Sequence, residues 1–268
     1  MLSYQHAYHA GCYADVIKHL ILTRIISYLT QKDKPLLYLD THSGRGLYDL
    51  EDKFAQKTNE FQAGIGKLWP QKNNLPVEFK QFIELIEHLN PSALKYYPGS
   101  PQIAQDLLRS QDRIYLCELH PQEINYLKKH ASQKNIYIEA TDGLSKIKAL
   151  IPPPEKRALI FIDPSYEVKT EYEASALAVV NNFIKFPQGV YMLWYPIVDT
   201  IHHSTILKYF KKIPTDKKLR LEFYLGQKTN MYGTGMLIIN PPYTLATESQ
   251  TIFQALQKIY INSDFIIC

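Results

Sequence analysis

Residues 159–166 read Leu159-Ile160-Phe161-Ile162-Asp163-Pro164-Ser165-Tyr166, an apolar run that stops at an acid followed by a proline. A short apolar run bounded in this way predicts a buried strand that ends at Asp163. In α/β sheets whose strands run mostly parallel, ligands bind outside the carboxyl ends of the strands. The stretch therefore predicts both such a sheet and a site at Asp163.

Predicted strands and helices alternate on both sides of this stretch. Strands are expected at residues 36–39, 113–117, 136–139, 158–162 and 190–195. Helices are expected at residues 15–29, 77–89, 144–150 and 171–186, and in segments that end near Arg109 and Lys129. Such alternation predicts an α/β fold with a mostly parallel, doubly wound sheet. Residues 219–225 and 236–239 are expected to add an antiparallel end.

Length and composition favour a single domain. The chain has 268 residues, of which 46% are hydrophobic, and this is enough for one large core. We expect one domain over residues 1–268, with the more polar segment 51–95 as a small inserted helical subdomain. The net charge of +4 permits a nucleic-acid partner but does not demonstrate one.

The sequence favours the cytoplasm. No apolar stretch is long enough to span a membrane, so we expect no membrane partner. The first residues lack the basic and apolar regions of a signal peptide. Cys12, Cys117 and Cys268 have no C-x-x-C spacing and are typical of reduced thiols.

A glycine loop, Asp40-Thr41-His42-Ser43-Gly44-Arg45-Gly46, follows the first predicted strand. Glycines there let the backbone approach a ligand without a Cβ clash, and a helix start nearby would offer free N–H groups. The full G-x-G-x-x-G pattern is absent, so a plain turn remains an alternative.

Acidic residues follow the next two predicted strands. Glu118 has the position at which a carboxylate accepts hydrogen bonds from the ribose hydroxyls of a nucleoside cofactor, although a single exposed glutamate is more often a solvated charge. Asp142 either accepts from an adenine amino group or closes an Asx-turn before Gly143. With Gly44, these acids form a pattern more specific than any one of its members.

The Asp163 motif suits chemistry on an amino group conjugated to an aromatic ring. Such a nitrogen is a poor nucleophile because its lone pair is delocalised into the ring. The Asp163 carboxylate and the Pro164 carbonyl can accept hydrogen bonds from its two N–H groups. These hydrogen bonds favour a tetrahedral nitrogen with a free lone pair. Tyr166 offers a π face to a base taken out of its helix. The alternative is a strand followed by an ordinary Asp-Pro turn.

This order of features resembles the Rossmann-fold adenine-N6 methyltransferases, and more narrowly the RlmJ family of 23S rRNA adenine-N6-methyltransferases. The likeness runs nearly end to end. The stretches that carry it are Met1-Leu2-Ser3-Tyr4, His9-Ala10-Gly11, Ala14-Asp15-Val16-x-Lys18-His19, Asp33-Lys34-Pro35, Leu37-Tyr38-Leu39-Asp40-Thr41-His42, Tyr96-Tyr97-Pro98-Gly99-Ser100-Pro101 and Leu193-Trp194-Tyr195-Pro196.

The resemblance implies S-adenosylmethionine as methyl donor, no metal, and an adenine of 23S rRNA, protein-free or early in assembly, as substrate. We expect a monomer. The cofactor site is expected to comprise Lys18, His19, His42, Gly44, Ser100, Glu118, Asp142, Gly143 and Asp163. The catalytic residues are expected to be Asp163, Pro164 and Tyr166. Substrate binding is assigned to Tyr4, His6 and Tyr166.

The chain departs from the family pattern at Ser165, where Asp-Pro-Pro-Tyr is usual. Both proposed acceptors survive this change, so we expect an effect on the rate rather than loss of activity. A second candidate motif, Asn240-Pro241-Pro242-Tyr243, matches the general pattern better. Too little chain follows it to complete a sheet, and its alternative interpretation is a Pro-Pro exit from an edge strand.

Other functions remain open on the sequence alone. A DNA adenine methyltransferase usually needs a target-recognition domain, and segment 51–95 is small for that role. A non-catalytic RNA- or nucleoside-binding module is the second alternative, with Ser165 as a sign of decay. His6, His9 and His19 invite a zinc site, but no supporting ligand spacing completes it. A basic stretch either contacts RNA phosphates or is a solvated face, namely Lys208, Lys211, Lys212, Lys217, Lys218 and Arg220.

Overall fold

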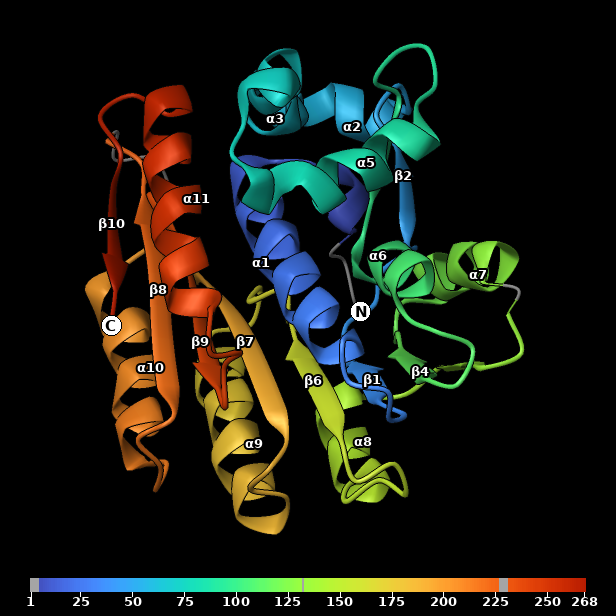
Figure 1. Cartoon of the computed structure of the whole chain (residues 1–268), viewed down its shortest axis with the longest axis vertical. Coiled ribbons are helices and arrows are strands. Elements are labelled where there is room, and N and C mark those ends of the chain that lie inside the picture. The colour runs from blue at the N-terminus through green and yellow to red at the C-terminus, as the bar shows by residue number, and fades with distance from the viewer. Residues whose placement is uncertain (1–4, 132, 227–230) are drawn as a thin grey trace.

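Eight strands form the main sheet of the computed structural model, which describes residues 5–131, 133–226 and 231–268 (Figure 1). They follow the order β10-β8-β9-β7-β6-β1-β4-β5. Their bounds are β1 (Leu37–Asp40), β4 (Arg113–Cys117), β5 (Ile136–Glu139), β6 (Ala158–Ile162), β7 (Val190–Ile197), β8 (Lys218–Tyr224), β9 (Gly233–Ile239) and β10 (Asp264–Ile267).

The parallel part of the sheet contains β5, β4, β1, β6 and β7 in spatial order. β9 runs antiparallel between β7 and β8, and β10 pairs antiparallel with β8 at the edge. The predicted α/β class with a mostly parallel sheet and an antiparallel end is therefore confirmed. The sequence did not predict the edge strand β10 itself.

Helices cover both faces of the sheet. Those with bounds near the prediction are α1 (Tyr13–Thr30), α5 (Lys80–Leu89), α6 (Ser100–Leu107), α7 (Pro121–His130), α8 (Gly143–Leu150) and α9 (Glu171–Lys185). Two further helices, which we did not predict, are α10 (Thr200–Lys212) and α11 (Leu245–Ile259). In Figure 1, α1 and α11 lie in front of the sheet, and α8, α9 and α10 lie behind it.

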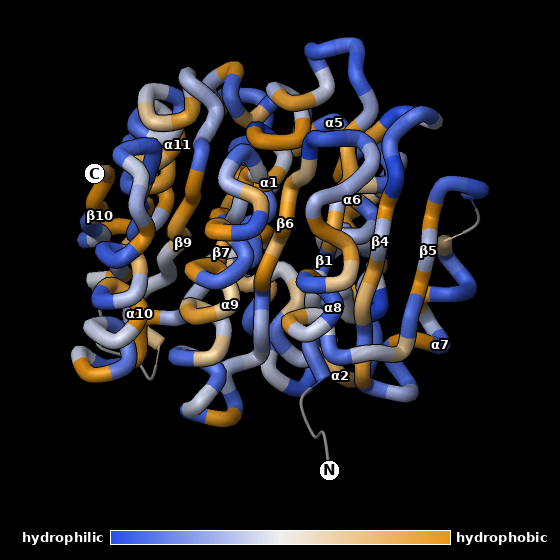
Figure 2. The backbone as a smooth tube through the Cα atoms, turned by 90° about the horizontal axis from the view of Figure 1, so that it is seen from below, coloured by the Kyte–Doolittle hydropathy of each residue, from blue (hydrophilic) through white to orange (hydrophobic). Residues whose placement is uncertain are grey.

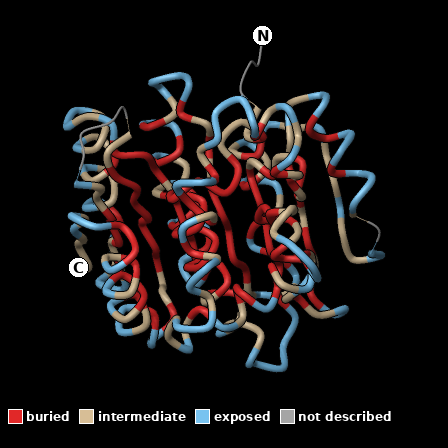
Figure 3. Tube along the Cα trace, turned by 90° about the horizontal axis from the view of Figure 1, so that it is seen from above, coloured by how far each residue is buried: buried red, intermediate tan, exposed pale blue. Residues whose placement is uncertain are grey.

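Alternation along the strands separates two hydrophobic cores. Successive side chains of a strand point to opposite faces. Tyr38 therefore packs in the hydrophobic core between the sheet and α1, whereas Leu37 and Leu39 pack in the core between the sheet and the helices α8 and α9. The central strands are largely hydrophobic in Figure 2 and buried in Figure 3. Among the described helices, none has the length and apolar character needed to cross a membrane.

Helix α1 is buried along most of its length, between the sheet and the helices α5, α6 and α11. Its buried residues include Asp15, Lys18 and His19, close together near its start. Since Lys and Asp are rarely buried unless they are paired, this end of α1 indicates a site rather than ordinary packing.

The glycine loop leads into a strand and not, as expected, into a helix. β2 (Leu47–Asp49) follows Gly46 and pairs antiparallel with β3 (Tyr96–Pro98). This pairing satisfies the backbone groups that a helix start would have left free. The segment between these strands holds α2 (Lys53–Thr58), α3 (Glu60–Ala63), α4 (Ile65–Leu68), η2 (Trp69–Asn74), η3 (Val77–Phe79) and α5.

Candidate active site

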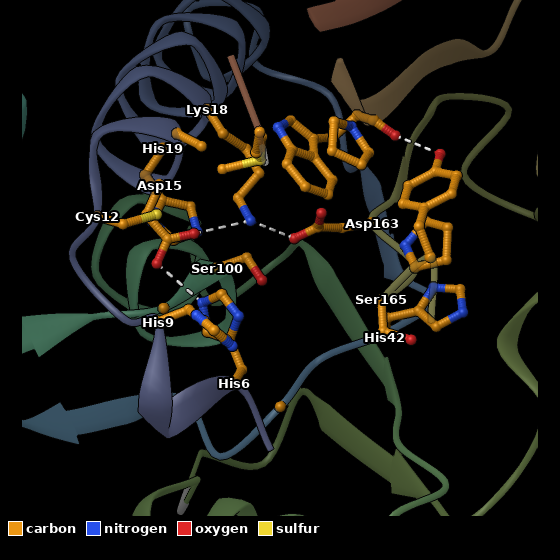
Figure 4. A pocket seen from close by; sticks show the side chains of 18 of the residues that line it. His6, His9, Cys12, Asp15, Lys18, His19, His42, Ser100, Asp163 and Ser165 are labelled. Carbon is orange, nitrogen blue, oxygen red and sulfur yellow. Dashed lines mark hydrogen bonds and ion pairs between the residues drawn. The ribbon is translucent and has the colours of Figure 1, made fainter. Parts of the chain in front are cut away.

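A pocket of about 740 Å³ opens at the carboxyl ends of β1, β4, β6 and β7, beside the start of α1 (Figure 4). Ligand sites in proteins typically measure about 300–1,000 Å³, so the pocket accommodates a nucleoside-sized molecule. Most of the residues predicted from the sequence lie in its wall: His6, Lys18, His19, His42, Gly44, Ser100, Glu118, Asp163, Pro164 and Tyr166. Tyr4 lies outside the described residues.

The Lys18 ammonium joins two carboxylates in this wall. Its Nζ lies 2.5 Å from Oδ2 of Asp163 and 2.9 Å from Oδ1 of Asp15. Asp15 Oδ2 in turn lies 2.8 Å from Nε2 of His6, which belongs to the short helix η1 (His6–Tyr8). Figure 4 shows Lys18 extending between the two aspartates. A single chain of contacts therefore connects the N-terminal segment to the end of β6.

Burial and charge act in opposite directions on this cluster. Burial raises the pKa of Asp163, and the Lys18 charge offsets part of that rise. Burial also opposes ionisation of Asp15, but His6 and Lys18 outweigh it and hold its pKa well below the usual range. Burial disfavours the charged form of Lys18, yet both aspartates together raise its pKa. Lys18 is therefore protonated at neutral pH, and it stabilises the carboxylate form of its partners.

Backbone N–H groups hold the Glu118 carboxylate in place. Its Oε2 accepts from the Gly44 N–H at 2.7 Å, and its Oε1 accepts from the His120 N–H at 2.7 Å. A carboxylate has about four acceptor positions, so lone pairs remain for a ligand. Burial raises the pKa of Glu118, although the hydrogen bonds from both N–H groups oppose that shift. The glycine loop thus positions the acid predicted to bind ribose hydroxyls.

Two histidines in the wall are neutral. Burial lowers the pKa of His19 to about 3 and that of His42 to about 4. His19 Nδ1 lies 3.0 Å from the Tyr97 hydroxyl, and His42 Nδ1 lies 2.8 Å from the Thr41 hydroxyl. Both therefore offer neutral imidazole groups, not positive charges, to a ligand.

Ser100 already has a protein partner. Its hydroxyl donates to Asp40 Oδ2 at 2.6 Å, behind the pocket wall. Burial raises the pKa of Asp40 to about 7, against the opposing effect of this hydrogen bond. The pair fixes the start of α6 against the end of β1.

Tyr166 adopts a left-handed backbone with φ of 57°. Such a conformation costs a tyrosine about 1–2 kcal/mol, and surrounding contacts must compensate for it. Its hydroxyl donates to the Trp194 carbonyl at 2.6 Å, and its ring centroid lies 4.3 Å from that of Tyr172. Only 8% of Tyr166 is exposed. The ring is thus held rigidly in the pocket wall, and its stacking on a base stays a prediction.

Comparison with known proteins decides the family. A family model described as "RsmJ: Ribosomal RNA large subunit methyltransferase D, RlmJ" matches residues 33–264. The chain belongs to the RlmJ family. The resemblance predicted from the sequence motifs is therefore confirmed, as is the α/β methyltransferase fold class.

Curated relatives extend this RlmJ match to nearly the whole chain. The sequence is 40% identical over 267 residues to "Ribosomal RNA large subunit methyltransferase J" of Haemophilus influenzae, covering 97% of this chain and 95% of that protein. It is also 40% identical over 263 residues to the protein of the same name from Escherichia coli K12, covering 96% of this chain and 94% of that one. A crystal structure of a Legionella pneumophila protein is similar with a TM-score of 0.92 and 48% identity, covering 97% of this chain and 98% of that chain.

Two residues assigned to the cofactor site lie outside the pocket wall of this RlmJ family member. Asp142 is exposed and caps α8, where it accepts from the Leu144 N–H at 3.1 Å and from the Ser145 hydroxyl at 2.5 Å. The geometry matches the Asx-turn alternative. Asp142 still influences His42, whose pKa its charge raises against the larger effect of burial. Its contact with the cofactor stays a prediction.

Gly143 has a packing reason of its own. A Cβ at this position would lie 2.1 Å from the Thr41 carbonyl oxygen, which is backbone and cannot move away easily. We expect Gly143→Ala to lower the free energy of unfolding by about 1–3 kcal/mol, measured by urea titration. Gly66→Ala is the matched control, because the nearest atom to its added Cβ is the end of the flexible Gln62 side chain at 3.0 Å. Equal stability of both variants would contradict this close approach.

Asp15 and Trp194 are among the residues of the RlmJ pocket that were not predicted from the sequence. Asp15 joins His6 to Lys18, and a signal existed, because residues three apart on a helix lie side by side. Trp194 places its ring centroid 4.8 Å from Lys18 Nζ, and its indole N–H donates to the Thr234 hydroxyl at 2.7 Å. No spacing rule predicts that Trp194 belongs to the site, because its position beside Lys18 depends on β7 lying next to β6.

The second candidate motif lies at the opposite end of the sheet. Asn240 follows β9, whose Ile239 pairs with Tyr191 near the start of β7, whereas the pocket lies near the end of β7. The Asn240 amide donates to the carbonyls of Pro187 and Gly189 at 2.8 and 2.7 Å. It therefore holds a loop in place at this end of the sheet. β9 lies between β7 and β8, so the motif does not leave an edge strand, as the alternative interpretation expected.

The histidines considered for zinc contact different partners in this family member. His6 contacts Asp15, His9 lies 2.9 Å from Glu60 Oε1, and His19 contacts Tyr97. Within residues 5–131, 133–226 and 231–268, no group of three or more His, Cys, Asp or Glu side chains is arranged to hold a metal ion.

Proposed function

We propose that this protein transfers a methyl group from S-adenosylmethionine to the N6 amino group of an adenine in 23S ribosomal RNA. Membership of a ribosomal RNA large subunit methyltransferase family supports the reaction and the class of substrate. The observation that carries the chemistry is Asp163, a mostly buried carboxylate at the end of β6 that is held by a charged lysine inside a nucleoside-sized pocket.

The pocket fits S-adenosylmethionine in its size and in its donor set. The Glu118 carboxylate, fixed by two backbone N–H groups, suits the two ribose hydroxyls. Gly44, whose N–H holds Glu118, has a φ of 61° that suits glycine, and an added Cβ there would meet the Tyr48 hydroxyl. When bound, the cofactor would supply a methyl group on a positively charged sulfur. The sulfur would leave as a neutral thioether and would need neither an acid nor a metal.

Asp163 and Pro164 then act on the amine. Oδ2 of Asp163 is paired with Lys18, which leaves Oδ1 to accept an N–H of the adenine amine. The Pro164 carbonyl is the second proposed acceptor. Together they position the nitrogen for in-line attack, and such alignment accounts for much of the rate enhancement in two-substrate reactions. The methylated nitrogen is acidic enough to lose its proton afterwards, so the step needs no strong base.

Labelled-methyl incorporation tests the substrate. We expect label in protein-free 23S rRNA, less or none in intact ribosomal subunits, and none in duplex DNA. Mass-spectrometric mapping of N6-methyladenine in rRNA from cells with and without the gene then identifies the site. Label only in DNA would refute the RNA assignment and favour a DNA adenine methyltransferase. Cofactor binding without turnover on any nucleic acid would favour a non-catalytic binding protein.

Ser165 provides a milder test of the same motif. Among the described residues, its hydroxyl makes two contacts, both long, at 3.4 Å to Glu171 Oε2 and 3.4 Å to the Glu167 N–H. We expect Ser165→Pro to stabilise the fold by about 0.4–1 kcal/mol and to change kcat by less than about fivefold, with the methylated adenine unchanged. Ser165→Ala is the control, since it removes the hydroxyl without restricting the backbone. A change in the methylated nucleotide would contradict this prediction.

A further inference from the structure

Aromatic rings and cations alternate in one continuous set of contacts that runs from the pocket rim across α2 to α7. The Tyr8 and Phe54 ring centroids lie 5.1 Å apart at an interplanar angle of 84°. The Arg45 guanidinium lies 5.6 Å from the Phe54 centroid and 4.6 Å from the Tyr126 centroid. We call this set the α2–α7 stripe. In Figure 1, both helices lie to the right of α1.

A lysine lies over each ring of the stripe. Lys53 Nζ is 5.2 Å from the Phe54 centroid, Lys57 Nζ is 5.5 Å from Tyr8, and Lys129 Nζ is 5.6 Å from Tyr126. All three lysines are exposed. Among the salt bridges of the described residues none involves these three, so their charges are available to a partner.

Arg45 is the buried cation of the stripe, in contact with both Phe54 and Tyr126. It is 5% exposed, and its Nε and Nη2 donate to the two oxygens of Glu123 at 2.9 and 2.7 Å. A bidentate pair of this kind is geometrically specific. Arg45 therefore holds the Phe54 and Tyr126 rings in fixed positions while Glu123 neutralises its charge.

The stripe is continuous with the pocket. Tyr8 lies between His6 and His9, which both line the pocket, and Glu123 lines it as well. The Tyr8 carbonyl accepts from the Thr58 hydroxyl, which ties this rim to the end of α2. The stripe therefore begins at the rim of the pocket.

We propose that the α2–α7 stripe binds the RNA strand next to the target adenine, with the lysines on phosphates and Tyr126 stacked on a base. Alternating cations and aromatic side chains are the features with which proteins hold single-stranded nucleic acid. The inference rests on the proposed function and specifies where the RNA lies. The other basic stretch points elsewhere, because Lys218 pairs with Ile239 at the sheet end remote from the pocket.

A charge-matched pair of variants tests the stripe. We compare K53Q/K57Q/K129Q with K208Q/K211Q/K217Q, which removes three exposed lysines from that remote stretch. The probe is a protein-free 23S rRNA transcript, with binding measured over a salt series. Each phosphate contact in a single strand contributes about 0.7 to the slope of log K against log salt, so the stripe variant is expected to lose about 2 in slope. We expect KM for RNA to rise at least about tenfold, and the control to match the wild type.

The aromatic part has its own test. Tyr126 is 42% exposed, so Tyr126→Ala is compatible with folding. We expect RNA binding about tenfold weaker in this variant, within the usual range for loss of one stacked base. Tyr126→Phe is expected to restore binding, because stacking needs the ring and not the hydroxyl.

The outcomes separate the stripe from the proposed function. Calorimetric affinity for S-adenosylmethionine is expected to be unchanged in every variant, because none of these side chains lines the pocket. Wild-type methylation of 23S rRNA together with unchanged KM and salt slope in K53Q/K57Q/K129Q would overturn the stripe alone. Equal losses in both triple variants would overturn it too, since they would show a general effect of net charge. Absence of methylation by the wild type would instead overturn the proposed function.

Discussion

Replacing Asp163 with alanine is expected to reduce methyl transfer to background while S-adenosylmethionine still binds. Asp163 is the carboxylate at the end of β6, with its side chain 12% exposed and Oδ2 paired with Lys18. Loss of a group that positions and polarises the reacting atom typically costs about 10²–10⁴-fold in rate. Because Lys18 keeps Asp15 as a partner at 2.9 Å, the variant retains a compensated charge and is expected to fold.

Asp163→Asn separates charge from shape in the same experiment. The amide occupies nearly the same volume, but it can place an N–H rather than an oxygen toward the adenine amine, and it no longer neutralises Lys18. We therefore expect this variant to be almost as inactive as alanine. Cofactor affinity by calorimetry and thermal unfolding are the controls. Full activity in either variant would refute the proposed mechanism.

The sequence predicted most of the parallel sheet because local patterns suffice there. β4, β5 and β6 are apolar runs bounded by turn residues, and their observed bounds match the predicted ones. β2 and β3 have three residues each and exist only through pairing with one another. Residues so far apart in the chain give no local sign of such pairing.

The C-terminal elements illustrate two kinds of omission. α11 carries buried apolar residues at helical spacing, Ile252, Phe253, Leu256 and Ile259, and this local pattern is sufficient to indicate a helix. β10 has four residues and is only partly buried, and its existence depends on the edge that β8 offers. An edge strand of this length lacks the alternating pattern that identifies longer strands.

The predicted site residues converge on one pocket because the parallel strands place their carboxyl ends at the same edge. Glu118 and Asp163 meet there although 45 positions separate their numbers in the sequence. For Asp15, the sequence offered only part of the information. Its spacing to Lys18 on the same helix indicates that pair, but a buried acid is costly without sufficient partners, and His6 and Asp163 join the cluster only through the packing of η1 and α1 on the sheet.

Asp15→Asn is expected to weaken both the fold and the reaction. The Asp15 side chain is 2% exposed and interacts at once with Lys18, His6 and the Gly11 N–H. Removing one partner of a buried ion pair costs about 3–5 kcal/mol, and we expect the lower part of that range because Lys18 keeps Asp163. Without Asp15, the ammonium is drawn to Asp163 alone and competes with the adenine amine. A displacement of about 1 Å can cost about 10²-fold in rate.

The pH dependence identifies the charge as the cause. His6 and Lys18, against the effect of burial, hold the pKa of Asp15 well below its usual value. A group with a lowered folded pKa stabilises the fold above its unfolded pKa, and that stabilisation disappears as pH falls toward the folded pKa. Urea unfolding of wild type and Asp15→Asn is therefore expected to differ most at pH 7, and the difference is expected to begin to shrink only below about pH 4, as pH falls toward the much lower folded pKa of Asp15. The exposed Asp216→Asn is the matched control for the loss of one carboxylate. A stability difference that stays constant from pH 7 into acid would show that shape, and not the Asp15 charge, supports the site.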